Sequence, residues 1–339
     1  MLQLERQQTF VALGDFLRSA NAQSELDEIA QRANYKNNWF TPANSLIALR
    51  AIADEFLTAD KLAVWANQYR SEPEISKTVG VVMAGNIPAV GFHDLLCVLM
   101  SGHKLLAKLS SQDFVLIHYL IQKLKEINPS FNTWIEEAER LNAADAYIAT
   151  GSSNTARYFE YYFAKKPHII RKNRTSVGLL MGEENSDEFL KLGHDISDYY
   201  GLGCRNVSTV LVPEGYDFIP LLRALEPQVP IYLNNHKYQN NYDYNKSIYL
   251  INGVPHLDNG YLLLTENDAL VSPISVLYFQ TYQTQADATA WLNERAERIQ
   301  VITSAQGWFS GSIPFGQTQR PSLEDYADGV DTMAFLASL

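Results

Sequence analysis

The sequence predicts an α/β protein with two domains, of which the first is built on a mainly parallel sheet and the second is also α/β. The chain has 339 residues, of which 46% are hydrophobic, so it can bury a large core and its length favours two domains. From residue 78 onward, short apolar runs alternate with helical patterns, which is typical of buried parallel strands. The alternation begins again near Thr175, which indicates the start of a second unit.

The residues before the first predicted strand favour helices. Apolar residues recur at spacings of three and four in four segments, which cover 10–20, 25–34, 41–56 and 62–69. Ser71-Glu72-Pro73 then ends the helical run. A helical N-terminal segment is therefore expected to precede the first sheet.

The first α/β region supplies three strands and three helices. The strands are expected over 78–84, 104–109 and 144–149. The helices are expected over 89–101, 113–127 and 153–165. Gly102 is expected to cap the first of these helices. Strands connected through helices imply right-handed crossovers and a mainly parallel sheet.

The second region continues this alternation less regularly. Its strands are expected over 176–181, 207–212, 261–265, 276–279 and 300–304. Its helices are expected over 187–200, 220–225 and 284–298. Residues 234–247 are rich in Asn and Tyr without a clear period, so they are interpreted as loop or edge structure. The tail over 307–339 also shows little periodicity.

Charge and cysteine content narrow the function classes. With 27 Lys and Arg against 38 Asp and Glu, non-specific binding to nucleic acid or anionic lipid is not expected. No stretch is apolar enough to span a membrane, and residues 1–18 lack a signal-peptide core, so we expect a cytoplasmic protein without integral membrane contact. The two cysteines, Cys97 and Cys204, are then free thiols. Without CxxC pairs or a His and carboxylate cluster, no metal site is predicted.

Cys204 is the candidate nucleophile. It lies in the sequence GLGCRN, where two glycines permit a sharp turn and the close approach of a ligand. A thiolate is the strongest common protein nucleophile and exchanges readily with thioesters, and the adjacent cation Arg205 would favour the thiolate if it lies nearby. An isolated intracellular Cys is more often a small buried apolar residue, and this interpretation suits Cys97, within DLLCVLM, better than Cys204.

Asn86 and Lys108 each follow or end a predicted strand. The Asn86 amide, in the loop GNIP, could donate to a developing oxyanion, although an Asn there can also simply serve the turn. Lys108 ends the apolar strand in LAKLSS and would point toward the nucleotide crevice of a parallel sheet, or else into solvent. Both alternatives stay open at this point.

Two further segments could bind phosphate. Thr150-Gly151-Ser152 joins a strand to a helix, so its N–H groups could hold a pyrophosphate, although no GxGxxG is present and a serine there can be a helix cap. Arg171, Lys172 and Arg174 form a basic cluster that could meet phosphates of coenzyme A or a dinucleotide, or could be a solvated loop.

Taken in order, these motifs resemble the aldehyde dehydrogenase superfamily and, more closely, its LuxC-type acyl-CoA reductases. The matching segments between residues 79 and 335 are GNIP, SGHKLLAKLSS, IATGSSNTARYF, YYGLGCRNVSTVLVP, SPISVLYF and IPFGQTQRPS. The resemblance implies that Cys204 is catalytic and that Asn86 is the oxyanion donor. The cofactor-binding residues that it implies are Lys108, Ser110, Ser111, Thr150, Gly151 and Ser152.

The resemblance also implies an aldehyde dehydrogenase-like fold with a defined domain order. N-terminal helices and a nucleotide-binding parallel-sheet domain are expected over 1–174, and a second α/β, catalytic cysteine domain over 175–320. Residues 321–339 would pack back on the first domain or on a partner subunit, and a homodimer stays open.

The departures from the superfamily point to reduction. Oxidising members carry a glutamate upstream of the cysteine that activates water, whereas here the stretch 171–174 reads RKNR. Ala269 occupies about the position of a second glutamate, which contacts the cofactor ribose. Ser111 stands where NAD-preferring members often have a glutamate, which favours NADPH over NADH.

The sequence thus predicts NADPH-dependent reduction of a fatty acyl-CoA or acyl-protein thioester to an aldehyde through acyl-Cys204. The alternatives are an acylating aldehyde dehydrogenase that runs toward the thioester, and a non-catalytic nucleotide-binding or interaction protein derived from the same fold.

Overall fold

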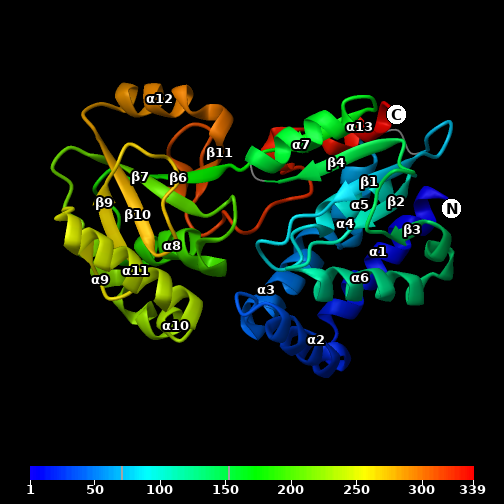
Figure 1. The fold of residues 1–339 in the computed structure, drawn as a ribbon, viewed down its shortest axis with the longest axis horizontal. Helices are drawn as coiled ribbons and strands as arrows, with labels where there is room; N and C mark the ends of the chain where they lie inside the picture. Colours follow the sequence, from blue (N-terminus) through cyan, green and yellow to red (C-terminus); the bar gives the residue numbers. More distant parts are fainter. Residues whose placement is uncertain (70–71, 152) are drawn as a thin grey trace. The chain divides into compact units, whose positions relative to one another are not determined.

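The computed structural model describes residues 1–69, 72–151 and 153–339, which form two compact units. The first unit contains Met1–Asn173 together with Pro321–Leu339, and the second contains Arg174–Arg320. Both ends of the chain therefore belong to the first unit (Figure 1). Each unit holds its own sheet, so the α/β prediction is confirmed.

The first unit begins with a helical segment, as predicted. Its helices are α1 (Gln3–Arg18), α2 (Gln23–Lys36), α3 (Pro42–Ala51) and α4 (Ala59–Ala66), with a π-helical turn over Ile52–Phe56. The start of α3 shows the local cause: Thr41 Oγ1 accepts the N–H of Asn44, and Pro42 occupies the first turn, where its missing N–H is harmless.

The sheet of the first unit is entirely parallel, with the strand order β3-β2-β1-β4-β5. The strands are β1 (Thr78–Val82), β2 (Lys104–Lys108), β3 (Ile135–Glu137), β4 (Ala146–Thr150) and β5 (His168–Arg171). The connecting helices include α5 (Phe92–Met100), α6 (Phe114–Ile127) and α7 (Ser153–Phe163). The edge strands β3 and β5 were not predicted, because they are only three and four residues long.

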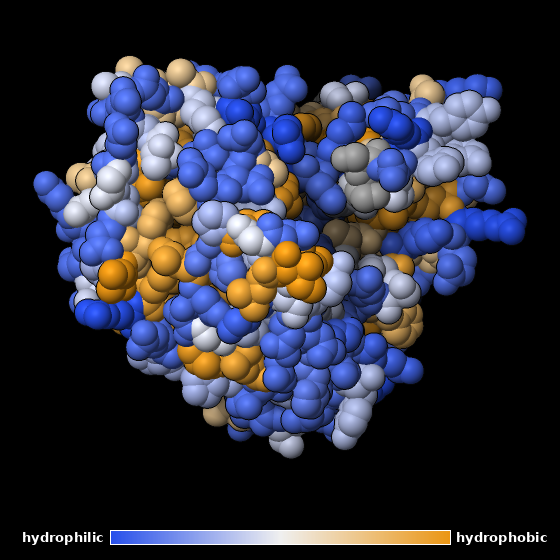
Figure 2. All heavy atoms as spheres, turned by 60° about the vertical axis from the view of Figure 1, so that its left-hand side comes forward, coloured by the Kyte–Doolittle hydropathy of each residue, from blue (hydrophilic) through white to orange (hydrophobic). Residues whose placement is uncertain are grey.

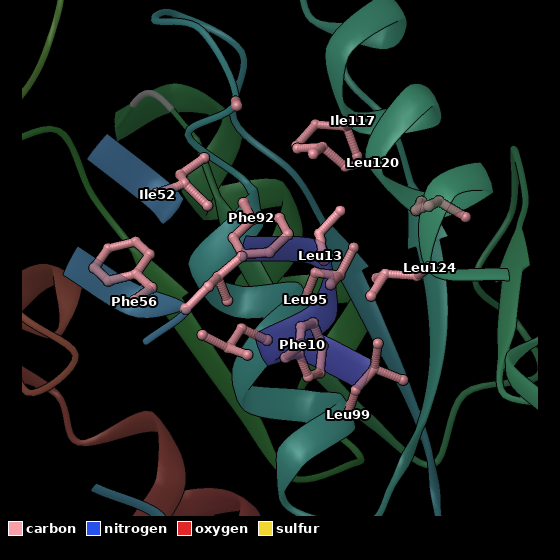
Figure 3. Close-up of a cluster of buried hydrophobic side chains, with 14 of the residues drawn as sticks. Phe10, Leu13, Ile52, Phe56, Phe92, Leu95, Leu99, Ile117, Leu120 and Leu124 are labelled. Atoms are coloured by element: carbon pink, nitrogen blue, oxygen red, sulfur yellow. The ribbon is translucent and has the colours of Figure 1, made fainter. Parts of the chain in front are cut away.

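The core of the first unit lies where α1, α5 and α6 meet. Figure 3 shows side chains from these helices pointing toward one another, and Phe10, Phe92 and Leu120 are fully buried. Helix α5 is mostly apolar, and seven of its nine residues are hydrophobic and buried. Cys97 on α5 is fully buried, as the sequence indicated, and burial raises the pKa of its thiol well above the ordinary value.

Gly102 ends α5 as predicted. Its φ of 86° lies in the left-handed region, which favours glycine. The Gly102 N–H donates to the Leu99 carbonyl and the His103 N–H donates to the Val98 carbonyl, each at 3.2 Å. This pair of bonds is the Schellman arrangement that closes many helices.

The C-terminal segment packs within the first unit. Helix α13 (Thr332–Ala337) contacts α5, and the Leu336 carbonyl lies 2.9 Å from Nε2 of the buried His103. The Trp65 Nε1 donates to the Tyr326 hydroxyl at 2.8 Å. Helix α13 was not predicted, because it has only six residues and follows a loop rich in Gly and Pro.

The sheet of the second unit has the order β12-β11-β6-β7-β10-β9-β8, and all its pairs are parallel except that of β8 with β9. Its strands are β6 (Thr175–Leu179), β7 (Val207–Pro213), β8 (Leu257–Asp258), β9 (Leu263–Glu266), β10 (Val276–Tyr282), β11 (Ile299–Ser304) and β12 (Ile313–Pro314). Its helices are α8 (Ser186–Ser197), α9 (Ile219–Leu225), α10 (Val229–Leu233), α11 (His236–Asn252) and α12 (Gln285–Glu294).

The interpretation of residues 234–247 as loop or edge structure was wrong, because they form most of α11. The Asn235 side chain accepts the N–H groups of Lys237 and Tyr238 and so caps the start of the helix. Tyr238, Tyr242 and Asn245 recur at spacings of four and three on its buried face. The helical period is therefore carried by tyrosine and asparagine, which a purely aliphatic pattern does not reveal.

The face drawn in Figure 2 is mostly hydrophilic and carries separate apolar patches. Exposed aliphatic side chains of the second unit include Ile219, Ile231, Leu250 and Ile251. Across the described ranges, no helix has both the length and the apolar character that crossing a bilayer requires.

Candidate active site

The two cysteines of the chain differ in exposure. Cys204 is partly exposed, in the connection between α8 and β7, whereas Cys97 is fully buried. The Cys204 carbonyl accepts a 3.1 Å hydrogen bond from Ser176 Oγ on β6. Because Ser176 is itself fully buried, this bond ties the cysteine backbone to the neighbouring strand.

A left-handed turn directly precedes the cysteine segment. Tyr199, Tyr200 and Gly201 have φ values of 52°, 61° and 73°, and the Leu202 N–H donates to the Tyr199 carbonyl at 3.3 Å. Left-handed backbone costs a non-glycine residue about 1–2 kcal/mol. The predicted helix over 187–200 therefore ends at Ser197, and the turn begins earlier than expected.

Asn206 connects this turn to the end of α8, and sequence reasoning did not single it out. Its Nδ2 donates to the backbone carbonyls of Asp195 (3.1 Å), Ile196 (3.3 Å) and Asp198 (2.9 Å). Its Oδ1 accepts the N–H of Gly203 at 2.8 Å. The sequence signal was weak, namely an Asn between a glycine turn and a strand.

Arg205 is anchored within the second unit. Its Nε donates to the Thr318 carbonyl at 2.5 Å. Thr318 is held in turn by the Asp195 carboxylate, which accepts its N–H and its hydroxyl. The same carboxylate accepts the N–H of Gly316. Burial raises the pKa of Asp195 to about 6, although these donors oppose the rise. The effect of Arg205 on the thiol stays a prediction.

The GNIP loop follows β1 and exposes Asn86. A Cβ at Gly85 would lie only 2.3 Å from Ser110 Oγ, so this loop packs directly against the loop that follows β2. Ala89, with a φ of 56°, ends the loop in the left-handed region. Ser110 is half-buried and its Oγ accepts the Gln112 N–H at 3.2 Å, so this predicted cofactor contact already serves the turn.

Three predicted cofactor segments share one edge of the first sheet. β1 pairs in parallel with β2 on one side and with β4 on the other, so the segments after Val82, Lys108 and Thr150 emerge at the same carboxyl edge. Lys108 and Ser111 are exposed there. The order of strands reverses between β1 and β4, and such a switch point is where open α/β sheets bind nucleotides.

Gly151, which directly follows β4, is tightly packed. A Cβ at Gly151 would lie 3.0 Å from the Cβ of Thr155, in the first turn of α7. The Gly151 N–H donates to the Arg171 carbonyl at 3.3 Å, and pyrophosphate binding by this turn stays a prediction. Ser152, the third residue predicted here, lies outside the described residues.

The three basic residues of the stretch 171–174 have different partners. Arg171 is buried, its NH1 lies 2.6 Å from an Asp94 oxygen, and its NH2 donates to the Thr332 hydroxyl at 2.8 Å. Lys172 is exposed and pairs with Glu160 at 3.1 Å. Arg174 donates to the Ile299 carbonyl at 3.2 Å. Arg171 is therefore engaged in a buried pair and Lys172 is exposed, and the phosphate contacts of this stretch stay a prediction.

Comparisons with known proteins agree on the fold. No family model and no curated protein sequence matches the chain. Aldehyde dehydrogenase 21 from Physcomitrella patens matches all of this chain and 84% of its own, with a TM-score of 0.71 and 11% identity.

Two further solved structures are similar. An NAD-dependent aldehyde dehydrogenase from Sinorhizobium meliloti matches 95% of this chain and 73% of its own, with a TM-score of 0.68 and 14% identity. An NADP dependent enzyme from E. coli matches 90% of this chain and 73% of its own, with a TM-score of 0.68 and 12% identity. The chain therefore has an aldehyde dehydrogenase-like fold.

Proposed function

We propose that this protein is an NADPH-dependent reductase of the LuxC type, which reduces an acyl thioester to an aldehyde through a thioester on Cys204. The observation that carries the proposal is Cys204 itself. It is the partly exposed one of the two cysteines, it follows a glycine turn, and its backbone is anchored by Ser176 in an aldehyde dehydrogenase-like fold. A fixed, accessible thiol is what nucleophilic capture of a thioester needs.

The capture step is a thiol exchange. The Cys204 thiolate attacks the carbonyl carbon, a C–S bond forms, and the electron pair moves onto the carbonyl oxygen. When this oxyanion collapses, the bond to the coenzyme A sulfur breaks and its thiolate leaves. In the proposal, the Cys204 N–H and the Asn86 amide donate to the oxyanion, and loss of such a donor typically slows turnover about 100- to 1,000-fold.

The first unit would hold the nicotinamide cofactor. Lys108 is proposed to contact the adenosine ribose, and the N–H groups of the turn after β4 the pyrophosphate. When bound, the cofactor would supply hydride to the acyl carbon. Ser111 offers no carboxylate to repel a 2′-phosphate, which supports NADPH over NADH.

Reduction, rather than hydrolysis, is supported by the stretch 171–174, which offers no carboxylate to activate water. Its first residue, Arg171, is committed to the buried pair with Asp94. An acyl group on Cys204 would then persist until hydride is transferred to it, whereas a general base would activate water and hydrolyse it.

Intact-mass measurement after incubation with a long-chain acyl-CoA tests the proposal. We expect a single acyl adduct on the wild type and on Cys97→Ala, the matched control with the buried thiol removed, and no adduct on Cys204→Ala. Addition of NADPH should discharge the adduct and release the aldehyde. An adduct that persists in Cys204→Ala would contradict the assignment, as would a wild-type protein that never acquires one.

A further inference from the structure

The segment that carries Cys204 is held in a conformation that its own residues disfavour. Tyr199 and Tyr200 both occupy the left-handed region, and both are buried. Such a backbone persists only where the surroundings over-determine it, and strain of this kind gathers at functional sites. A neighbouring side chain is therefore expected to restrain the backbone of these two residues.

We propose that Asn206 is the positioning residue of the Cys204 segment. Its carboxamide bonds to both ends of the strained region: Nδ2 reaches the Asp198 carbonyl just before the left-handed turn, and Oδ1 holds the Gly203 N–H just before the cysteine. The same Nδ2 also bonds to the carbonyls at the end of α8. One side chain thus joins the helix end, the turn and the cysteine segment.

The backbone of Asn206 extends this restraint to the sheet. Its carbonyl accepts the Ser176 N–H at 3.1 Å, while the Ser176 hydroxyl donates to the Cys204 carbonyl. Asn206 is only 3% exposed, so it acts through the backbone and does not touch a substrate. Its removal should therefore slow the reaction of Cys204 without weakening the binding of the thioester.

The inference rests on the proposed thioester capture, and the test keeps the two separate. The rate of Cys204 acylation by acyl-CoA is measured by mass spectrometry of samples quenched at successive times. Hydrogen exchange of the backbone amides of 199–206 is measured on the same proteins. In Asn206→Ala we expect acylation to slow about 100-fold at saturation, because a displacement of about 1 Å can have that effect. The half-saturating acyl-CoA concentration should stay unchanged, and exchange of 199–206 should quicken about 10-fold.

Asn245→Ala is the matched control. Asn245 is another buried asparagine of the second unit, and its Nδ2 donates at 2.9 Å to the carbonyl of Ile274, a residue outside 199–206. This variant should lose comparable stability yet keep the wild-type acylation rate and the wild-type exchange of 199–206. A role of Asn206 that is merely structural would make the two variants alike.

Asn206→Asp provides a second variant should the alanine protein not fold. The shape is kept, but an ionised carboxylate offers no hydrogen to the three carbonyls, whereas a protonated one offers an O–H. The ratio of its acylation rate to that of the wild type should therefore rise as the pH is lowered. A ratio independent of pH would overturn the positioning role.

The remaining outcomes are distinct. If the wild type is acylated and Asn206→Ala reacts at the same rate, the inference is overturned and the proposed function stands. If the wild type is never acylated, the proposed function fails, and hydrogen exchange alone decides: faster exchange of 199–206 in Asn206→Ala supports the restraint, and unchanged exchange overturns it.

Discussion

Asp195 shows at the residue scale how a buried carboxylate can support the cysteine segment at a cost in stability. It accepts hydrogen bonds from Gly316 and Thr318, and Thr318 in turn accepts one from Arg205, the neighbour of Cys204. Burial nevertheless raises its pKa to about 6. Because the folded protein holds this proton more tightly than the unfolded chain does, stability is expected to fall as the pH rises from about 4 to 6.

The pH dependence of stability tests whether folding raises the pKa of Asp195. One pKa unit corresponds to about 1.4 kcal/mol, so the wild type should lose about 2 kcal/mol of unfolding free energy, relative to Asp195→Asn, between pH 4 and pH 7. Urea unfolding of both proteins at several pH values measures the difference, and the other titrating groups cancel in it. Parallel curves would show that folding does not raise the pKa of Asp195.

Residues whose partners are close in sequence were easier to predict than residues whose partners are distant. The contrast between Cys97 in an apolar helix and Cys204 in a glycine turn is visible in the sequence, and their exposures differ accordingly. Asp195 and Thr318 are 123 positions apart, so no local pattern reveals their bond. Asn206 was missed because its role depends on where α8 ends.

At the element scale, the contact between the loops after β1 and β2 limits what residue 85 can be. In Gly85→Ala the new Cβ would meet Ser110 Oγ at 2.3 Å and Ser110 Cβ at 2.5 Å, both well inside van der Waals contact. Overpacking of this kind costs about 1–3 kcal/mol. We expect Gly85→Ala to unfold at lower urea concentration and to bind NADPH more weakly, as measured by fluorescence titration.

The double variant Gly85→Ala, Ser110→Gly is the control for this prediction. Removing the serine side chain removes both close contacts, so much of the lost stability should return. If the double variant is less stable than the Gly85→Ala protein, the two loops do not meet as described.

The elements that sequence reasoning missed share a physical cause. β3 and β5 are short edge strands, α13 has six residues, and α11 carries its helical period on tyrosine and asparagine. The long, apolar elements were predicted to within a few residues, because burial on both faces leaves a continuous hydrophobic signal. Short elements form where tertiary packing overrides such local preferences.

At the scale of the whole molecule, the chain leaves the first unit at Asn173 and returns to it at Pro321. The returning C-terminal segment is held by contacts between α13 and α5. It is also held by the buried Arg171, which pairs with Asp94 and donates a hydrogen bond to Thr332 of α13. These partners lie 77 and 161 positions from Arg171, which is why the basic cluster looked exposed in the sequence.

Substitutions of this pair separate a structural role from phosphate binding. Arg171→Ala leaves the Asp94 carboxylate buried without its partner, a change that costs about 3–5 kcal/mol. A double substitution, Arg171→Met with Asp94→Leu, replaces the pair by apolar side chains of similar volume, which is often neutral in energy. We therefore expect the single variant to unfold at much lower urea concentration and the double variant to unfold close to the wild type.

The affinity of the double variant for NADPH and acyl-CoA then decides the role of Arg171. If Arg171 only ties the returning segment to the first unit, restored stability should bring wild-type affinity for both ligands. If it contacts a phosphate, the double variant should fold well and still bind one of them about 10-fold more weakly, since a lost charge-assisted hydrogen bond removes roughly 1.5–3 kcal/mol. Lys172→Ala, which removes the exposed cation of the same stretch, is the matched comparison: a phosphate contact at this stretch would weaken binding in that variant without changing its stability.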